Sequence, residues 1–203
     1  MRTSALFILM LFTYDSYAQS YFGFKSGLTL SKQQIKHSFA DVEYTEHMHF
    51  SAFYEGFRSK YLSAIGEIAY QRKGFAYDVE TTTEEHPEGT GDFLDVGNRY
   101  SYLSVTLLGK IRYSIGDFVP YFCAGPRVDF KIGERSTPLL LYYNKWAKKR
   151  LYGYSLGTGL ELPKLFSKIV LIEFMVSPDI SDVYVEPFDV KNRSFQASVG
   201  IMF

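Results

Sequence analysis

The sequence is short of several features on which common classes of protein depend. Its 203 residues include a single cysteine, and the formal net charge is zero at pH 7. One cysteine, Cys123, cannot form an internal disulfide, so a disulfide framework is excluded. A balanced charge argues against a nucleic-acid partner, because such proteins present an excess of basic residues.

Long hydrophobic runs are also missing. The one apolar run near the start, Ala5 to Phe12, is followed by small residues at Ser16 and Ala18. This arrangement is typical of a secretory signal peptide, and the run is too short for a membrane-spanning helix, which needs about twenty residues. We therefore expect residues 1–18 to be a signal peptide and residues 19–203 to form one exported domain.

The rest of the chain alternates apolar and polar residues with period two, which predicts β-strands. In the last segment, for example, Phe195, Val199 and Phe203 share one face, whereas Ser194 and Ser198 share the other. Helical spacing is nowhere sustained, so no substantial helix is expected. The predicted strands span residues 21–31, 47–57, 61–74, 99–113, 118–130, 151–162, 168–177 and 194–203.

The connections between these segments alternate in length. Those at 58–60, 114–117 and 163–167 are short, whereas the others are long and polar, at 32–46, 75–98, 131–150 and 178–191. An even strand count with this alternation is the organisation of a transmembrane β-barrel. We predict an all-β, eight-stranded antiparallel up-and-down barrel, with short periplasmic turns, long extracellular loops and both termini on the short-turn side.

Charged residues of the predicted strands gather on one face. Both signs are present in about equal measure, and the opposite face carries almost no charge, Arg72 being an exception. In a membrane barrel the charged face lines the lumen, and unpaired buried charges are costly, so we predict a lumen network that fills the interior. Its expected members are Lys25, Glu67, Lys73, Lys110, Arg112, Arg127, Asp129, Glu161 and Glu173.

Two alternatives have different consequences for this face. The charges could line a narrow pore for small solutes, or the barrel could be soluble, with its charged face outward and a ligand cavity inside. Aromatic residues at the strand ends favour a membrane, because aromatic girdles mark its two interfaces. The expected girdle residues are Tyr21, Phe22, Phe57, Tyr61, Phe75, Tyr100, Tyr113, Phe118, Tyr152 and Phe203.

Several stretches together resemble the PorT-like, "outer membrane protein beta-barrel" family of Gram-negative bacteria. They are residues 22–27, 67–75, 102–110, 120–126, 153–161 and 200–203, and the resemblance extends over nearly the whole of residues 19–203. Thr106 departs from the pattern, because proline is expected there. The resemblance implies an integral outer-membrane barrel without catalytic residues or cofactors, and some members of the family assist protein secretion linked to gliding.

The function expected from these features is that of a non-enzymatic barrel. It would act through its extracellular loops or as an accessory of envelope or secretion machinery, with a narrow pore as the alternative. The basic aromatic cluster Trp146, Lys148, Lys149 and Arg150 could contact lipopolysaccharide headgroups. The oligomeric state cannot be predicted from the sequence.

Other candidate sites are weaker. His37, His47, His49 and His86 are expected near the long-loop rim, where His47 and His49 share a strand face but have no third metal ligand. A rim-active enzyme could use His86 with Asp92 or Asp95. The acidic loop residues Glu80, Glu84, Glu85, Glu88, Asp92 and Asp95 could bind a divalent cation or a basic partner, and Cys123 is expected in the lumen as inert filler.

Overall fold

The computed structural model describes residues 19–35, 44–80, 91, 93–138, 145–165, 168–185 and 190–203. The expected signal peptide, residues 1–18, lies outside the described residues and stays a prediction. Within the described part of the chain, no helix is long and apolar enough to cross a membrane.

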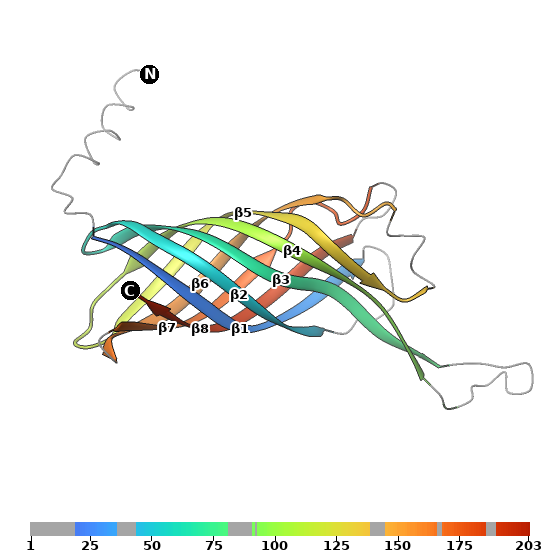
Figure 1. Ribbon diagram of the computed structural model, residues 1–203, viewed down its shortest axis with the longest axis horizontal. Coiled ribbons are helices and arrows are strands. Elements are labelled where there is room, and N and C mark those ends of the chain that lie inside the picture. Colours follow the sequence, from blue (N-terminus) through green and yellow to red (C-terminus); the bar gives the residue numbers. More distant parts are fainter. Residues whose placement is uncertain are drawn as a thin grey trace, which may run out of the picture.

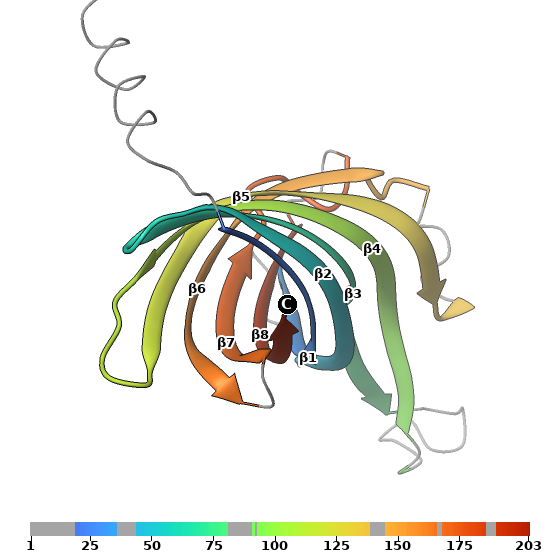
Figure 2. The same ribbon diagram turned by 60° about the vertical axis from the view of Figure 1, so that its left-hand side comes forward.

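Eight strands form one closed barrel, as predicted (Figures 1 and 2). Each strand pairs antiparallel with the next, and β1 pairs with β8 from Gly23↔Met202 to Ile35↔Val190, which closes the sheet. The strands are β1 (Gln19–Ile35), β2 (Thr45–Arg58), β3 (Leu62–Glu80), β4 (Phe93–Arg112), β5 (Val119–Ser136), β6 (Arg150–Leu165), β7 (Lys168–Pro178) and β8 (Val190–Met202).

The two ends of the barrel differ. The short turns between β2 and β3 and between β4 and β5 lie at one end. Strand β1 begins at this end, and residue 203 also lies there. Phe22 and Phe203 exchange backbone hydrogen bonds at this point. At the opposite, long-loop end, the β3–β4 hairpin projects beyond the other strands (Figure 1). The expectation that both ends of the domain lie at the short-turn end is therefore confirmed.

The β3–β4 hairpin is longer than predicted. We expected a loop over residues 75–98, but the ladder continues from Phe75↔Asn98 to Glu80↔Phe93. Backbone hydrogen bonds hold this extension, and they do not require the apolar alternation on which the sequence prediction depends. The expected acidic loop is correspondingly reduced, and Glu84, Glu85, Glu88 and Asp92 lie outside the described residues.

The exterior of the barrel wall is apolar. Phe24 of β1, Leu107 of β4 and Phe174 of β7 are each more than half exposed. Exposed apolar surface on this scale is unfavourable in water and suits a lipid environment. The soluble-barrel alternative is wrong, because the charged face of the strands points inward.

Most of the expected girdle residues face outward, but three do not. Tyr100 and Phe75 are buried in the barrel, and Tyr21 packs against an interior cluster. Each of the three is an even number of residues away from a lumen-facing charged residue on the same strand. Because side chains alternate between the two faces of a strand, all three point inward although they are aromatic. Strand-end position alone was therefore an insufficient criterion for a girdle residue.

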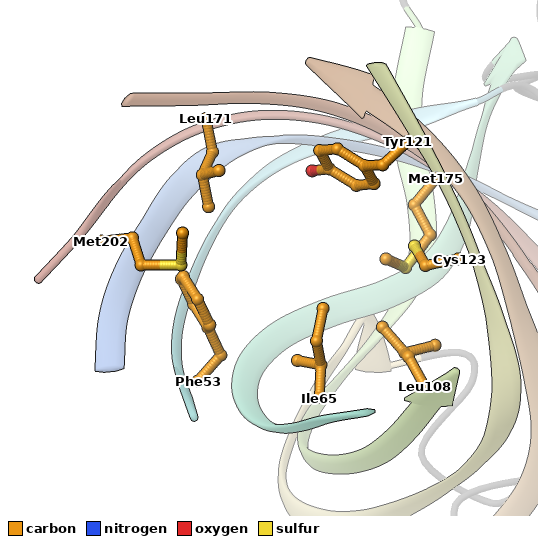
Figure 3. Close-up of a cluster of buried hydrophobic side chains, with 8 residues drawn as sticks. All are labelled: Phe53, Ile65, Leu108, Tyr121, Cys123, Leu171, Met175 and Met202. Atoms are coloured by element: carbon orange, nitrogen blue, oxygen red, sulfur yellow. The ribbon is translucent and has the colours of Figure 1, made fainter. Parts of the chain in front are cut away.

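Apolar side chains also fill part of the interior. Eight of them form a buried cluster. They come from six strands and point toward one another inside the wall (Figure 3). Such interdigitation is expected of an eight-stranded barrel, whose interior is just wide enough for side chains. The cluster consists of Phe53, Ile65, Leu108, Tyr121, Cys123, Leu171, Met175 and Met202.

Closure at the β1–β8 seam constrains Gly27. A Cβ atom at this position would collide with the carbonyl oxygen of Ala197 and lie 2.7 Å from the Cα atom of Ser198. A Cβ atom at Gly66, on the outer surface of β3, would meet nothing within 4 Å. We therefore predict that Gly27→Val lowers the fraction of closed barrel after refolding, whereas Gly66→Val leaves it nearly unchanged.

The measurement is the share of protein that migrates faster in an unboiled than in a boiled sample on an SDS gel. If Gly27→Val and Gly66→Val gave the same fraction of fast-migrating protein, the close approach of the backbones at the β1–β8 seam would be contradicted.

Candidate functional site

Lys25 lies at the centre of a buried ion cluster. Its Nζ is 2.5 Å from Glu67 of β3 and 2.6 Å from Glu173 of β7, and all three side chains are at most 9% exposed. The hydroxyl of Tyr121 donates to Glu173 at 2.8 Å. Gly200 makes room for the lysine, because a Cβ atom there would lie 2.6 Å from the Lys25 Cγ.

A second cluster lies nearer the short-turn end. Lys110 contacts Glu161 and, at 2.9 Å, Glu55. Arg112 reaches Glu55 at 3.1 Å, and Arg58 reaches Glu161 at 2.7 Å. Two carboxylates thus form ion pairs with three cations. These pairs connect β2, β4 and β6, which lie on different sides of the wall.

A third cluster lies in the long-loop half of the lumen. Lys73 is 2.5 Å from Asp129 and 3.2 Å from Asp179, and Arg127 contacts both aspartates. Asn192 donates to Asp179 at 2.8 Å. The charges of this cluster balance, two cations against two carboxylates, so the buried groups compensate one another.

Aromatic residues cover this third cluster on the long-loop side. Tyr100 and Tyr102 of β4 pack with Val183 and Tyr184, which come from the segment after β7. The amide of Asn98 donates to the hydroxyls of Tyr100, at 2.6 Å, and Tyr184, at 3.1 Å. Burial raises the pKa of Tyr184 above its usual value, so its hydroxyl stays protonated at neutral pH.

The structure brings together all nine residues expected in the lumen network. They divide into the three clusters above, with every one of these side chains buried. Sequence reasoning missed Arg58 and Asp179, which lie just outside the predicted strands. The expected network also does not include Glu55. The signal that could have found Asp179 is its parity, because it continues the inward positions of Glu173 on β7.

The basic aromatic cluster of the third long loop lies at the long-loop end. Trp146 is 42% exposed, and Lys149 and Arg150 are also exposed. The backbone is held by hydrogen bonds from Val185 to Trp146, and from Lys148 to Val183. This segment therefore presents its side chains outward from an ordered backbone.

The histidine and cysteine candidates have ordinary environments. His49 is 3% exposed, faces the lumen and hydrogen-bonds the Thr29 hydroxyl through Nδ1 at 3.1 Å. Cys123 is buried in the apolar cluster. Among the described residues, no three His, Cys, Asp or Glu side chains are placed to hold a metal ion. His37 and His86 lie outside this part of the chain.

Several solved structures share the architecture. Neisserial surface protein A aligns with a TM-score of 0.52 at 10% identity, covering 90% of this chain and 97% of that one. Outer membrane protein AlkL, solved in lipid bilayers, gives 0.52 at 12% identity, covering 94% and 93%. OprG from Pseudomonas aeruginosa gives 0.49 at 11%, covering 92% and 97%.

The chain has the fold of the small outer-membrane β-barrels. Together with the apolar exterior, this fold places the protein in an outer membrane, with its short turns toward the periplasm and its long loops outside. No protein-family model matches the sequence. No curated protein matches it either.

The Lys25 cluster gives a stability prediction. Lys25→Met leaves two buried carboxylates facing each other, so we expect a loss of about 3–5 kcal/mol in the free energy of unfolding. The triple variant Lys25→Met, Glu67→Gln, Glu173→Gln removes all three charges and should recover much of that loss. Urea titration of barrels folded in detergent measures both.

Lys131→Met is the matched control, because its partner Glu134 is 43% exposed. A partly exposed pair of this kind contributes less than about 1 kcal/mol. The central place of Lys25 would be wrong if its replacement cost no more than that of Lys131.

Proposed function

We propose that the protein is a non-enzymatic outer-membrane barrel with a sealed lumen, acting through its extracellular side or as an accessory of envelope or secretion machinery. The observation that carries this proposal is the filled interior. Three charge clusters and an apolar cluster occupy the lumen, and tyrosines cover its outer end. A barrel filled in this way leaves its external surfaces as the place where partners bind.

The narrow pore is the alternative function. Its support would be the polar lining itself, since lumen charges select ions in larger barrels. Here each of the cations Lys25, Lys73 and Lys110 bridges two carboxylates from distant parts of the chain. A permeating ion would have to break these bridges, so the filled barrel is favoured.

An enzymatic role has less support. His47 and His49 belong to the inward positions of β2, and His49 lies below the rim, bonded to Thr29. The other expected catalytic pair, His86 with Asp92 or Asp95, lies where the side chains are not described. The proposal therefore assigns no catalytic residue.

The external contacts are assigned to the third long loop. We propose that Trp146, Lys148, Lys149 and Arg150 contact lipopolysaccharide. The guanidinium of Arg150 lies 5.8 Å from the ring centre of Phe130, an outward residue at the border of the apolar wall. Membership of the PorT-like family and a role in secretion are part of the same proposal and rest on the sequence resemblance.

Conductance tests the sealed lumen. In planar bilayers we expect no steady unit conductance from the wild-type chain, measured beside an open porin as a positive control. The variant Tyr100→Ala, Tyr184→Ala should also be silent, because the charge clusters beneath the tyrosines remain. A reproducible unit conductance from the wild-type protein would instead establish the narrow pore.

Photo-crosslinking tests action through the extracellular side. A photoreactive residue in place of Lys149 should give adducts with lipopolysaccharide or an envelope protein in intact cells. The control carries the same residue in place of Ile115, which is exposed in a periplasmic turn. Adducts at residue 115 with none at residue 149 would contradict the proposed site of action.

A further inference from the structure

Three arginines line a cavity on the outer surface of the wall, near its extracellular rim. The cavity has a volume of about 520 Å³ and contains Arg72 of β3, Arg99 of β4 and Arg135 of β5. A neighbouring cavity of about 300 Å³ shares Arg99 and Arg135. Residues 44–47 at the start of β2 form the remaining side of the larger cavity.

A register shift brings Arg135 to this surface. Before the shift, Lys131 of β5 is opposite the buried Tyr102; after it, Arg135 is opposite Arg99. Strict alternation from Arg127 and Asp129 would have turned Arg135 into the lumen. A β-bulge re-aims side chains in this way, and such irregularities are common near functional sites.

The cavity is rich in positive charge. Arg99 and Arg135 are directly opposite each other on adjacent strands, which concentrates positive charge at the cavity. The acidic residues among the lining are Glu46 and Glu134, and Glu134 is already bound by Lys131 at 2.8 Å.

The donors are held in position. The Nε of Arg72 donates to the Tyr70 hydroxyl at 3.1 Å, and this hydroxyl also lies 3.2 Å from the Ser101 Oγ. The guanidinium of Arg72 is thereby fixed while its side chain stays exposed. His47, at an inward position of β2, also contributes to the lining of the cavity.

The cavity lies at the level of the lipid headgroups. From Tyr113, directly after β4, back to Leu103, the outward side chains are apolar, and Ser101 and Arg99 come next. About ten residues of strand rise about 34 Å, which a tilt of about 40° reduces to about 26 Å across the membrane. This matches the apolar band of about 25 Å that such barrels present to lipid.

We propose that Arg72, Arg99 and Arg135 bind the phosphate group of a phosphorylated glycolipid in the outer leaflet. The planar guanidinium group presents paired N–H donors that match phosphate oxygens, and charge-assisted bonds of this kind are strong. The site is separate from the Trp146 loop, and it rests on the placement of the barrel in an outer membrane. It lies on the wall itself, so it would select the lipids that surround the barrel.

The test uses the full chain, purified in detergent and titrated with bis-phosphorylated lipid A or its dephosphorylated form, with bound lipid counted by native mass spectrometry. The wild-type chain should bind the phosphorylated form more tightly. Arg72→Gln, Arg135→Gln should weaken that binding at least about tenfold, because two charge-assisted contacts are lost. Millimolar inorganic phosphate should not compete, since the ligand is the lipid.

Lys191→Gln, Arg193→Gln is the matched control, because it also removes two exposed cations, on β8 near the same rim. This variant should change the affinity less than about twofold, because it leaves the bonds at the arginine cavity intact. Equal losses in both double variants, or equal wild-type affinity for the two lipids, would overturn the proposal. Full competition by inorganic phosphate would also overturn it. Faster migration of each unboiled variant shows that the barrel is folded, which separates failure of this site from failure of the membrane placement.

Discussion

Closure of the sheet is the constraint on which the rest of the structure depends. In lipid, a backbone N–H or C=O group without a partner costs several kcal/mol, so a sheet can cross only if its first and last strands pair. Here β1 and β8 meet along most of their length. The seam demands close backbone approach at Gly27, and it also fixes an interior so narrow that every inward side chain must fit among its neighbours.

Placing apolar residues outside has a direct consequence inside. The polar side chains of each strand are sequestered with one another, and their charges must be neutralised there. Lys25, Lys73 and Lys110 each contact two carboxylates from distant parts of the chain, so the clusters hold separate parts of the wall together. The same feature that makes the fold compatible with lipid thus fills the lumen, which supports the proposal that partners bind at the rim and loops.

The outer rim contrasts with this compensated interior. Arg99 and Arg135 face outward on paired strands, beside Arg72, at the height where the apolar wall ends. The lumen charges are paired across the barrel, whereas these arginines lie on the outer side of the wall, at the height expected of lipid headgroups. The position of the arginines therefore suits lipid recognition better than stabilisation of the barrel.

The sequence by itself determined the strand count, the closed up-and-down order and the inward face of each strand, because side-chain alternation is a local property with period two. It also indicated the nine lumen residues, although not their partners. Tertiary structure decided the rest. Asp179 joins Lys73 and Arg127, Tyr184 covers the lumen, and Arg135 turns outward after a register shift. Each of these depends on strand register or on the path of the segment that follows β7. Both are set by contacts between residues far apart in the sequence, which a local pattern does not record.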